Sequence, residues 1–361
     1  MHSRPPLARP LCAALGLLLL VAGTAIAQAP VQITEFPVGG QPIPLTVGSD
    51  GNFWAWNSGM TEVTRMTPTG VVTAFPTALG FPETTPGHCV DAHDGNIWCS
   101  NTGGPILRMS VTTGASIVFD LPPNAGAMDL TLGPDGALWF TDFGLNQIGR
   151  MTLTGAVTEF PVPAAFIAPR SITVGPDNAL WFTGDDAQVG RMDLAGGGFR
   201  YYNLPEFPNN TVAAMSAIRT GPDGNLWLGI TPITGPPKMY RVSPSGQITG
   251  FVLPNAADGV IDIVAGPDGA IWFTEESASQ IGRITTSGAI TEYDLQPNSG
   301  PVGIAVGWDG AIWFTEALTA RIGRLSGGPL RATPVPTLTP ALLALLAATL
   351  AASGWFLSRS K

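Results

Sequence analysis

The sequence predicts an all-β fold, a seven-bladed β-propeller built from four-stranded blades. The first observation is the motif Gly-Pro-Asp-Gly-Ala-Ile-Trp-Phe-Thr-Glu at 266–275, in which a tight turn leads into an apolar strand. The second is its repetition every 41 to 46 residues, centred on Trp54, Trp98, Trp139, Trp181, Trp227, Trp272 and Trp313. A strand-rich repeat of this length is typical of propeller blades, so seven copies predict seven blades.

Each repeat contains four segments that we expect to be the strands of one blade. In chain order they are a short apolar run (303–306 in the last repeat), the tryptophan strand, an Ile-Gly-Arg strand (148–151) and a Val-Thr-Glu-Phe strand that precedes proline (157–160). The last repeat stops after its third strand at 322–325, and a fourth-strand sequence occurs near the N-terminus instead, at 33–37. We therefore predict that this N-terminal strand completes the last blade and closes the ring.

Two polar positions recur in all seven repeats, an aspartate in the turn and an arginine in the third strand. A binding site is normally asymmetric, whereas sevenfold recurrence predicts a scaffold role in which arginine ties neighbouring strands or turns together. The aspartates are Asp50, Asp94, Asp135, Asp177, Asp223, Asp268 and Asp309, and the arginines are Arg65, Arg108, Arg150, Arg191, Arg241, Arg283 and Arg324.

Composition and charge exclude nucleic acid as a partner. Charged residues make up 12% of the chain, and its formal net charge is −9. Five of the 17 basic residues lie in the two ends, where no acidic residue is found. The central part is therefore more acidic than the whole chain and carries no basic stripe that would neutralise phosphates. We expect the folded domain, residues 28–330, to be a monomer.

The N-terminal segment has the pattern of a secretory signal peptide. Arg4 and Arg9 precede an apolar run at 11–22, and Ala25-Ile26-Ala27 follows as a cleavage site. A membrane-spanning helix is the weaker alternative, because such a helix needs about 20 apolar residues. We predict that residues 1–27 direct export through the Sec pathway and are removed before Gln28.

The C-terminal segment, residues 331–361, has the composition of a membrane-attachment signal. Thr-Pro-Val-Pro-Thr-Leu at 333–338 is followed by an apolar run at 341–357 and by two basic residues, Arg359 and Lys361. This arrangement resembles the IPTL-CTERM sorting signal, with Val335 where that signal has Ile. The resemblance implies an exosortase-like processing enzyme in a Gram-negative bacterium, which holds the protein at the inner membrane before transfer to the cell surface or release. The alternative is a plain tail anchor, a transmembrane helix with a cytoplasmic C-terminus.

Candidate ligand-binding residues lie where the repeats differ from one another. The second strand of a blade ends on the face of the ring where the first strand begins, so residues from both places share that face. Clustered carboxylates there could bind Mg²⁺ or Ca²⁺, with Glu275 and Glu316 as the candidate ligands. The alternative is that these carboxylates are solvated strand ends. The candidates for the ligand face are His88, Asp142, Arg170, Asp185, Glu275, Glu276 and Glu316.

Several of the quoted motifs resemble the virginiamycin B (streptogramin B) lyase family. The similarity is carried by Gly-Pro-Asp-Gly-Ala-Leu-Trp-Phe-Thr-Asp at 133–142, Gln-Ile-Gly-Arg at 147–150 and Val-Thr-Glu-Phe-Pro at 157–161, and it extends over roughly residues 33–325. It implies a seven-bladed propeller and, for the lyases proper, Mg²⁺-dependent opening of a cyclic depsipeptide by elimination. It also implies two working histidines in neighbouring blades, each at the start of a first strand in a Pro-His-x-Ile context, and nearby glutamates.

No histidine occupies those strand starts in this sequence. The seven positions are Ile43, Gly87, Met128, Arg170, Ser216, Ile261 and Val302, and His88 lies one residue beyond the start of its strand. Because elimination requires both a proton-accepting and a proton-donating group, His88 alone would not fill both roles. We therefore predict an exported, surface-associated binding module for a glycan, peptide or small molecule. The alternative is an enzyme, either a Mg²⁺-dependent carbon–oxygen lyase that opens cyclic depsipeptides or a carboxylate–metal hydrolase.

Cys89 and Cys99 are predicted to form a disulfide. They replace apolar residues on the first two strands of the second blade, and the connection between these strands, at 93–95, would place the two side chains opposite each other. Export to an oxidising compartment would allow the bond to form. The alternative is a pair of buried thiols.

Overall fold

The computed structural model describes residues 30–58, 62–77, 86–102, 104–163, 168–185, 187–205, 212–232, 235–254 and 259–330. The segments interpreted as a signal peptide and a sorting signal lie outside these residues. Across the ranges given above, no helix has the length and apolar character needed to cross a bilayer.

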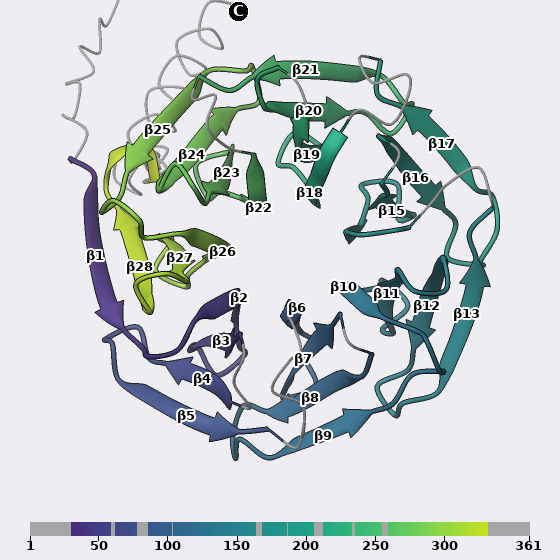
Figure 1. Cartoon of the computed structure of the whole chain (residues 1–361), viewed down its shortest axis with the longest axis horizontal. Coiled ribbons are helices and arrows are strands. Elements are labelled where there is room, and N and C mark those ends of the chain that lie inside the picture. The colour runs from purple at the N-terminus through teal and green to yellow at the C-terminus, as the bar shows by residue number, and fades with distance from the viewer. Residues whose placement is uncertain are drawn as a thin grey trace, which may run out of the picture.

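Seven four-stranded antiparallel sheets form a closed ring, which confirms the predicted propeller (Figure 1). In blades 1 to 6 the strands follow chain order from the central channel to the outer edge, and in blade 7 the outermost strand is the N-terminal β1. Blades 1 to 3 consist of β2 (Pro42–Val47), β3 (Phe53–Asn57), β4 (Glu62–Met66), β5 (Val72–Pro76); β6 (Pro86–Asp91), β7 (Asn96–Asn101), β8 (Ile106–Ser110), β9 (Ser116–Phe119); and β10 (Ala127–Leu132), β11 (Leu138–Asp142), β12 (Gln147–Met151), β13 (Val157–Pro161).

The remaining blades repeat this order. Blades 4 to 6 consist of β14 (Ile172–Val174), β15 (Leu180–Thr183), β16 (Gln188–Met192), β17 (Arg200–Asn203); β18 (Val212–Thr220), β19 (Leu226–Pro232), β20 (Lys238–Val242), β21 (Ile248–Val252); and β22 (Val260–Ala265), β23 (Ala270–Glu275), β24 (Gln280–Thr285), β25 (Ile290–Asp294). Blade 7 consists of β26 (Pro301–Val306), β27 (Ile312–Glu316), β28 (Arg321–Ser326) and the N-terminal β1 (Gln32–Pro37), and a 3₁₀ turn at Gly328–Leu330 follows β28.

The N-terminal strand closes the ring as predicted. β1 pairs antiparallel with β28 from Gln32 opposite Ser326 to Pro37 opposite Arg321 (Figure 1). Phe36 of β1 stacks on Trp313, with ring centroids 5.6 Å apart. The first and last strands of the described chain therefore share one sheet, and the ring is fastened by a contact between its two ends.

The recurring tryptophan, aspartate and arginine hold each blade together. In every blade the buried indole Nε1 donates a hydrogen bond of 2.9 to 3.2 Å to the turn aspartate. A fourth-strand aromatic ring stacks on each indole at 5.1 to 5.6 Å. In blades 3, 4, 6 and 7 the arginine Nε also donates to that aspartate at 2.7 Å. These contacts support the scaffold role predicted for the three positions.

A hydroxyl group two residues after the tryptophan joins each of several blades to the next. Thr141 Oγ1 accepts a hydrogen bond from the backbone N–H of Asp129 in its own blade and donates to the carbonyl of Arg170 in blade 4. The corresponding hydroxyls of Ser100, Thr274 and Thr315 make the same pair of contacts in blades 2, 6 and 7. The first strands are thereby held at a common height around the channel.

Cys89 and Cys99 form the predicted disulfide. The two residues lie directly opposite each other on β6 and β7, with their Cα atoms 4.1 Å apart. In the chain-entropy account, a crosslink with a sequence separation of 10 stabilises the fold by about 2–3 kcal/mol.

We expect alkylation of the denatured protein without reductant to leave the intact mass unchanged at these two cysteines. Prior reduction should add two labels and lower the free energy of unfolding by the same 2–3 kcal/mol or so. Labelling of both cysteines without reductant would show that the pair exists as thiols.

Candidate functional site

The first strands of the seven blades surround the central channel (Figure 1). In β2, β6, β10, β22 and β26 the pairing with the second strand is interrupted by a bulge near the strand start. Leu130 and its equivalents, just beyond this bulge, are buried between blades. Because side chains alternate along a strand, the residue before each of them faces the channel. These channel-facing residues are Pro44, His88, Asp129, Ser171, Ala217, Asp262 and Gly303.

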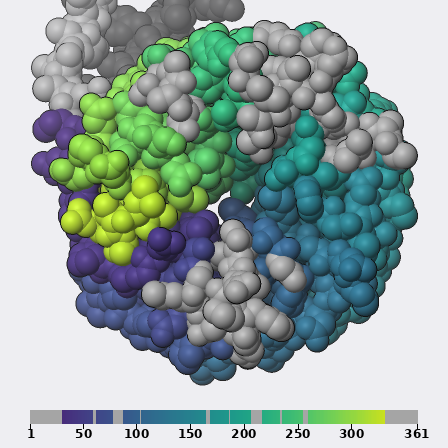
Figure 2. Space-filling model, in the orientation of Figure 1, coloured from purple at the N-terminus to yellow at the C-terminus, as the bar shows by residue number. Residues whose placement is uncertain are grey.

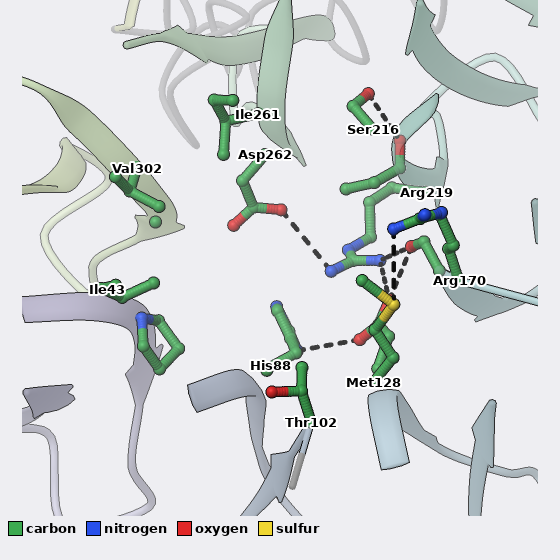
Figure 3. A pocket seen from close by; sticks show the side chains of 16 residues that line it. Ile43, His88, Thr102, Met128, Arg170, Ser216, Arg219, Ile261, Asp262 and Val302 are labelled. Carbon is green, nitrogen blue, oxygen red and sulfur yellow. Dashed lines mark hydrogen bonds and ion pairs between the residues drawn. The ribbon is translucent and has the colours of Figure 1, made fainter. Parts of the chain in front are cut away.

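A pocket of about 270 Å³ lies at the mouth of the channel where the first strands begin. Figure 2 shows the central opening of the ring, and Figure 3 shows the side chains around it. Ile43, Met128, Ile261 and Val302 supply most of the apolar wall, while His88 and Arg219 lie deeper. Phe143 is also strongly exposed on this face, at 42%. The pocket therefore combines an apolar rim with a polar floor.

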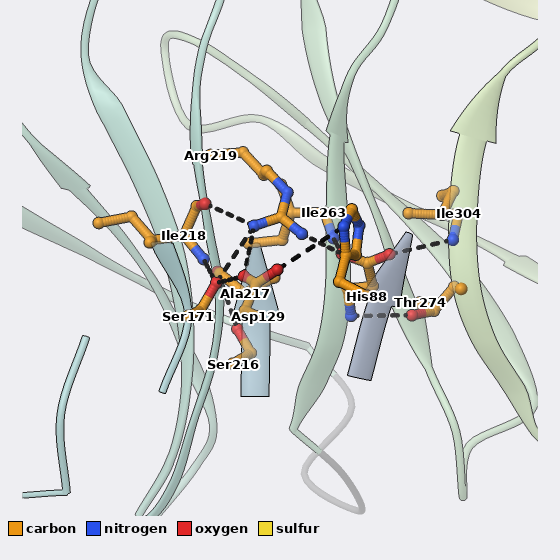
Figure 4. A network of polar contacts seen from close by, with 12 residues as sticks. His88, Asp129, Ser171, Ser216, Ala217, Ile218, Arg219, Ile263, Thr274 and Ile304 are labelled. Carbon is orange, nitrogen blue, oxygen red and sulfur yellow. Dashed lines mark hydrogen bonds and ion pairs between the residues drawn. The ribbon is translucent and has the colours of Figure 1, made fainter. Parts of the chain in front are cut away.

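Arg219 forms the floor by crossing the channel from β18 (Figure 4). Its Nη1 donates to Asp129 Oδ2 at 3.2 Å, to Ser171 Oγ at 3.1 Å and to the carbonyl of Ile218 at 2.9 Å. Its Nη2 lies 3.5 Å from Asp262 Oδ1. A second cavity, of about 500 Å³, also contacts Arg219 and His88 and lies toward the other end of the first strands. Arg219 and His88 therefore lie between the two cavities.

The two aspartates also join neighbouring blades. Asp129 Oδ2 accepts from the backbone N–H of Ile172 at 3.0 Å and from Ser171 Oγ at 2.6 Å, both in blade 4. Asp262 Oδ2 accepts from the backbone N–H of Ile304 in blade 7 at 3.2 Å. Each carboxylate also accepts from the N–H of the residue that follows it. This floor is consequently both a structural junction and the most polar part of the pocket.

The protonation of this floor follows from its burial and its charges. Burial alone would raise the pKa of Asp129, but Arg219, His88 and the hydrogen bonds from Ser171 and Ile172 hold it below its usual value. Burial and the Arg219 charge lower the pKa of His88, so its imidazole is neutral at pH 7. Nδ1 of His88 lies 3.6 Å from Asp129 Oδ1. With one cation and two carboxylates, the floor carries a net charge of about −1 at neutral pH.

Comparison with known proteins decides the family of this channel-bearing propeller. The family model described as "Virginiamycin B lyase family" matches residues 31–228 and 206–358. The chain belongs to the virginiamycin B lyase family.

Individual relatives agree with this assignment. A virginiamycin B lyase of Nocardia farcinica is 29% identical over 178 residues, a stretch that spans 48% of this chain and only 57% of that protein. A streptogramin B lyase structure is 31% identical and superposes with a TM-score of 0.72, covering 82% of this chain and 98% of the other. A virginiamycin B lyase of Staphylococcus aureus, a catalytically inactive histidine-to-alanine variant with quinupristin, is 28% identical with a TM-score of 0.74, covering 82% and 99%.

Two of the residues predicted for the ligand face line the pocket, and a third supports one of them. His88 and Arg170 are part of its wall. Asp185 holds the Arg170 guanidinium through both oxygens, from Nε to Oδ1 and from Nη2 to Oδ2, the latter at 3.1 Å. The guanidinium also lies 5.0 Å from the centre of the Phe143 ring. Arg170 is therefore fixed at the rim, with its charge balanced by Asp185.

The other predicted carboxylates do not line the pocket. Asp142, Glu275 and Glu316 end the second strands of their blades and are fully buried. Asp142 Oδ1 accepts from the backbone N–H groups of Gly126 and Leu145, and Glu316 Oε2 accepts from the Thr319 hydroxyl. Burial raises the pKa of Glu316. Glu276, half-buried, belongs to the turn after β23.

The pocket residues of this family member do not fit a divalent cation. Among the residues that the structure describes, no group of three or more His, Cys, Asp or Glu side chains could hold a metal ion. Glu275 and Glu316 lie on separate blades outside the pocket lining. Between Asp129 and Asp262, the place that a metal would take is filled by the Arg219 guanidinium. The two carboxylates of the pocket floor therefore form ion pairs with an arginine, in the place where they would coordinate a metal ion.

Sequence reasoning missed Asp129, Ser171, Arg219 and Asp262, which make up most of the floor. It placed His88 one residue beyond its strand start without noting that Asp129 and Asp262 occupy the same position in their own repeats. That shared position was the available signal, because it directly precedes the core residue of each first strand. Arg219 lies two residues after Ala217, which holds the shared position in blade 5. The equivalents of Arg219 in the other six repeats are small or apolar residues, so the sequence shows it as a single charged exception.

Proposed function

We propose that the protein is a binding propeller that holds a small molecule, peptide or glycan in the pocket at the channel mouth. The observation that supports this most is the composition of the pocket, which has an apolar wall at its rim and a fixed polar floor beneath it. Apolar surface supplies affinity, and a few well-placed polar groups set orientation and specificity. The seven surrounding blades hold these groups on strands and so pre-organise the site.

Binding fits the chemistry of the floor better than catalysis does. The oxygens of Asp129 and Asp262 accept hydrogen bonds from backbone N–H groups of two blades and face Arg219. Neither carboxylate is free to take a proton from a substrate without loss of these contacts. A reaction that needs both a base and an acid would have His88 as its one uncommitted titratable side chain among the described pocket residues.

A lyase that opens cyclic depsipeptides is the second candidate function. It is favoured by identities of 28% and 31% to structures of streptogramin-type lyases, one of them with quinupristin. In that relative a histidine-to-alanine change accompanies the inactive state. The histidine that would serve in this chain is His88, whose neutral imidazole borders the pocket.

We also propose that the propeller is exported and held at a membrane or cell surface by its C-terminal segment. The targeting pattern at 1–27 and the apolar run at 341–357 support this proposal. Pro30 and Leu330 line a cavity of about 330 Å³ together with the β26–β27 turn at Asp309–Ala311, on the face of the ring opposite the starts of the first strands. A tether leaving from Leu330 would leave the pocket mouth unobstructed.

One experiment tests binding and turnover together. The purified protein is titrated with quinupristin and with glycan and peptide libraries, and the ligand is followed by chromatography and absorbance in the presence of Mg²⁺. We expect a ligand to bind without being converted, and we expect Ile261→Trp, at the partly exposed rim of the pocket, to weaken the affinity at least tenfold. Val252→Trp on the outer strand β21, which is also exposed, is the matched control and should bind like the wild type.

The results separate the two functions. Conversion of quinupristin that His88→Ala abolishes would support the lyase and overturn the binding proposal. Binding that is equally strong in wild type and Ile261→Trp would place the ligand outside the pocket and contradict the proposed site.

A further inference from the structure

We propose that the pocket selects cationic ligands, in which a protonated amine is attached to an apolar body. This inference rests on the proposed binding function and specifies its ligand class. It follows from the balance of charges on the pocket floor, from the unequal compensation of the two aspartates and from the apolar wall beside one of them.

The floor has an excess of one negative charge. Asp129 and Asp262 face a single guanidinium, that of Arg219, and the imidazole of His88 adds no charge at neutral pH. At the rim the charge of Arg170 is cancelled by Asp185 through a two-point contact. An unbalanced charge in a partly enclosed channel acts more strongly than one on an open surface, because less water screens it.

The excess is concentrated at Asp262. Asp129 accepts hydrogen bonds from Arg219, at 3.2 Å, from the Ser171 hydroxyl and from two backbone N–H groups. Asp262 accepts hydrogen bonds from two backbone N–H groups, and its distance from the Arg219 guanidinium, 3.5 Å, is longer than that of Asp129. Its side chain is 10% exposed and borders the pocket. Asp262 is therefore the carboxylate with the greater remaining capacity for a charged donor from the ligand.

The surroundings of Asp262 define the rest of the ligand. Ile261, Val302 and Ile43 form the wall on its side of the channel, as Figure 3 shows. An ammonium group at Asp262 would thus place its attached carbon skeleton against aliphatic side chains. A carboxylate ligand would meet the net negative floor at this depth, and a neutral ligand would gain no charge–charge attraction there.

The pH dependence of binding follows from His88. The charged groups that face it are Asp129 from β10, Arg219 from β18 and Asp262 from β22. Protonation of His88 would bring the net charge of the floor to zero and place a cation near the ammonium site. Affinity for an amine should therefore fall as the pH drops through the pKa of His88, which burial and Arg219 hold below the ordinary histidine value of 6.5, whereas affinity for a neutral analogue should not fall.

The test compares three probes that share one apolar body: phenethylamine, the neutral N-acetylphenethylamine and the anionic 3-phenylpropionate. Ligand-observed NMR titrations with the wild-type protein at pH 7.5 should show the amine binding at least tenfold more tightly than the other two. Asp262→Asn should remove this preference. Asp120→Asn, which removes one negative charge beyond the end of the outer strand β9, should retain it. His88→Gln should abolish the decline of amine affinity at acidic pH.

Each outcome bears on a separate claim. If the neutral or anionic probe binds as tightly as the amine, cation selection is wrong while the binding function stands. If none of the three binds at millimolar concentration, cation selection is likewise overturned, and the comparison of Ile261→Trp with wild type still decides the binding function. Because the probe comparison uses only the wild-type protein, its result does not depend on whether Asp262→Asn folds.

Discussion

Deletion of residues 28–38 should lower the free energy of unfolding by about 5 kcal/mol or more and make the protein associate. The deletion removes β1, whose backbone pairs with β28 along six residues. It also removes Phe36 from the face of Trp313 and Glu35 from its ion pair with Arg321. The loss combines ladder hydrogen bonds at about 1 kcal/mol each with the exposure of buried apolar surface. The free edge of β28 would then be open to pairing with another chain.

Urea unfolding followed by tryptophan fluorescence measures the loss, and light scattering measures the association. A synthetic peptide of residues 28–38, added in excess, should restore stability by occupying the vacant edge. The same peptide with Phe36→Ala should restore less, because the aromatic ring that packs between Trp313 and the turn glycine Gly70 is missing. An unchanged unfolding midpoint in the deletion variant would show that ring closure contributes little.

The fold was predictable because the residues within one repeat are enough to explain the turn and the buried strand of a blade. The motif around Trp272 combines a turn aspartate that accepts from the indole with a strand buried on both faces. The missing fourth strand of the last repeat predicted the pairing of β1 with β28, and the placement of Cys89 opposite Cys99 followed from the length of one turn. Each of these inferences required only local geometry and the count of strands.

The candidate site was less predictable because it depends on which face a side chain takes. Glu275 and Glu316 were expected to present carboxylates to a ligand; they end their second strands beside the starts of the first strands, and their side chains are fully buried. The bulges in first strands such as β10 and β22 determine which residues line the rim and which face the channel. Arg219 reaches the pocket floor from a position two residues farther along its strand than Asp129 and Asp262 along theirs, because its side chain is long. None of these features is encoded in the hydrophobic periodicity of a single repeat.

Replacement of Arg219 by methionine should destabilise the protein by about 3–5 kcal/mol at neutral pH. Methionine fills a similar volume but removes the cation that lies between Asp129 and Asp262. Removing one member of a buried charge pair leaves its partner uncompensated, which costs more than the pair contributes. Arg200→Met on the exposed outer strand β17 is the control and should change stability by less than about 0.5 kcal/mol.

The effect should depend on pH with a definite sign. In the wild type, the depressed pKa of Asp129 means that its contribution to stability is present above the unfolded-state pKa of about 3.9 and is lost as the pH falls through the folded-state value. Without Arg219, burial would instead raise the pKa of Asp129, so the variant would fold best with this group protonated. The difference in unfolding free energy between wild type and Arg219→Met should therefore be largest near pH 7 and shrink toward pH 4.

Urea unfolding at both pH values measures this difference, and Asp129→Asn completes a double-mutant cycle. Because the main cost in Arg219→Met is an uncompensated carboxylate, adding Asp129→Asn should recover part of the stability instead of adding a second full loss. Additive losses, or a difference that stays constant from pH 7 to pH 4, would mean that Arg219 stabilises the channel by packing its aliphatic stem and not by its charge.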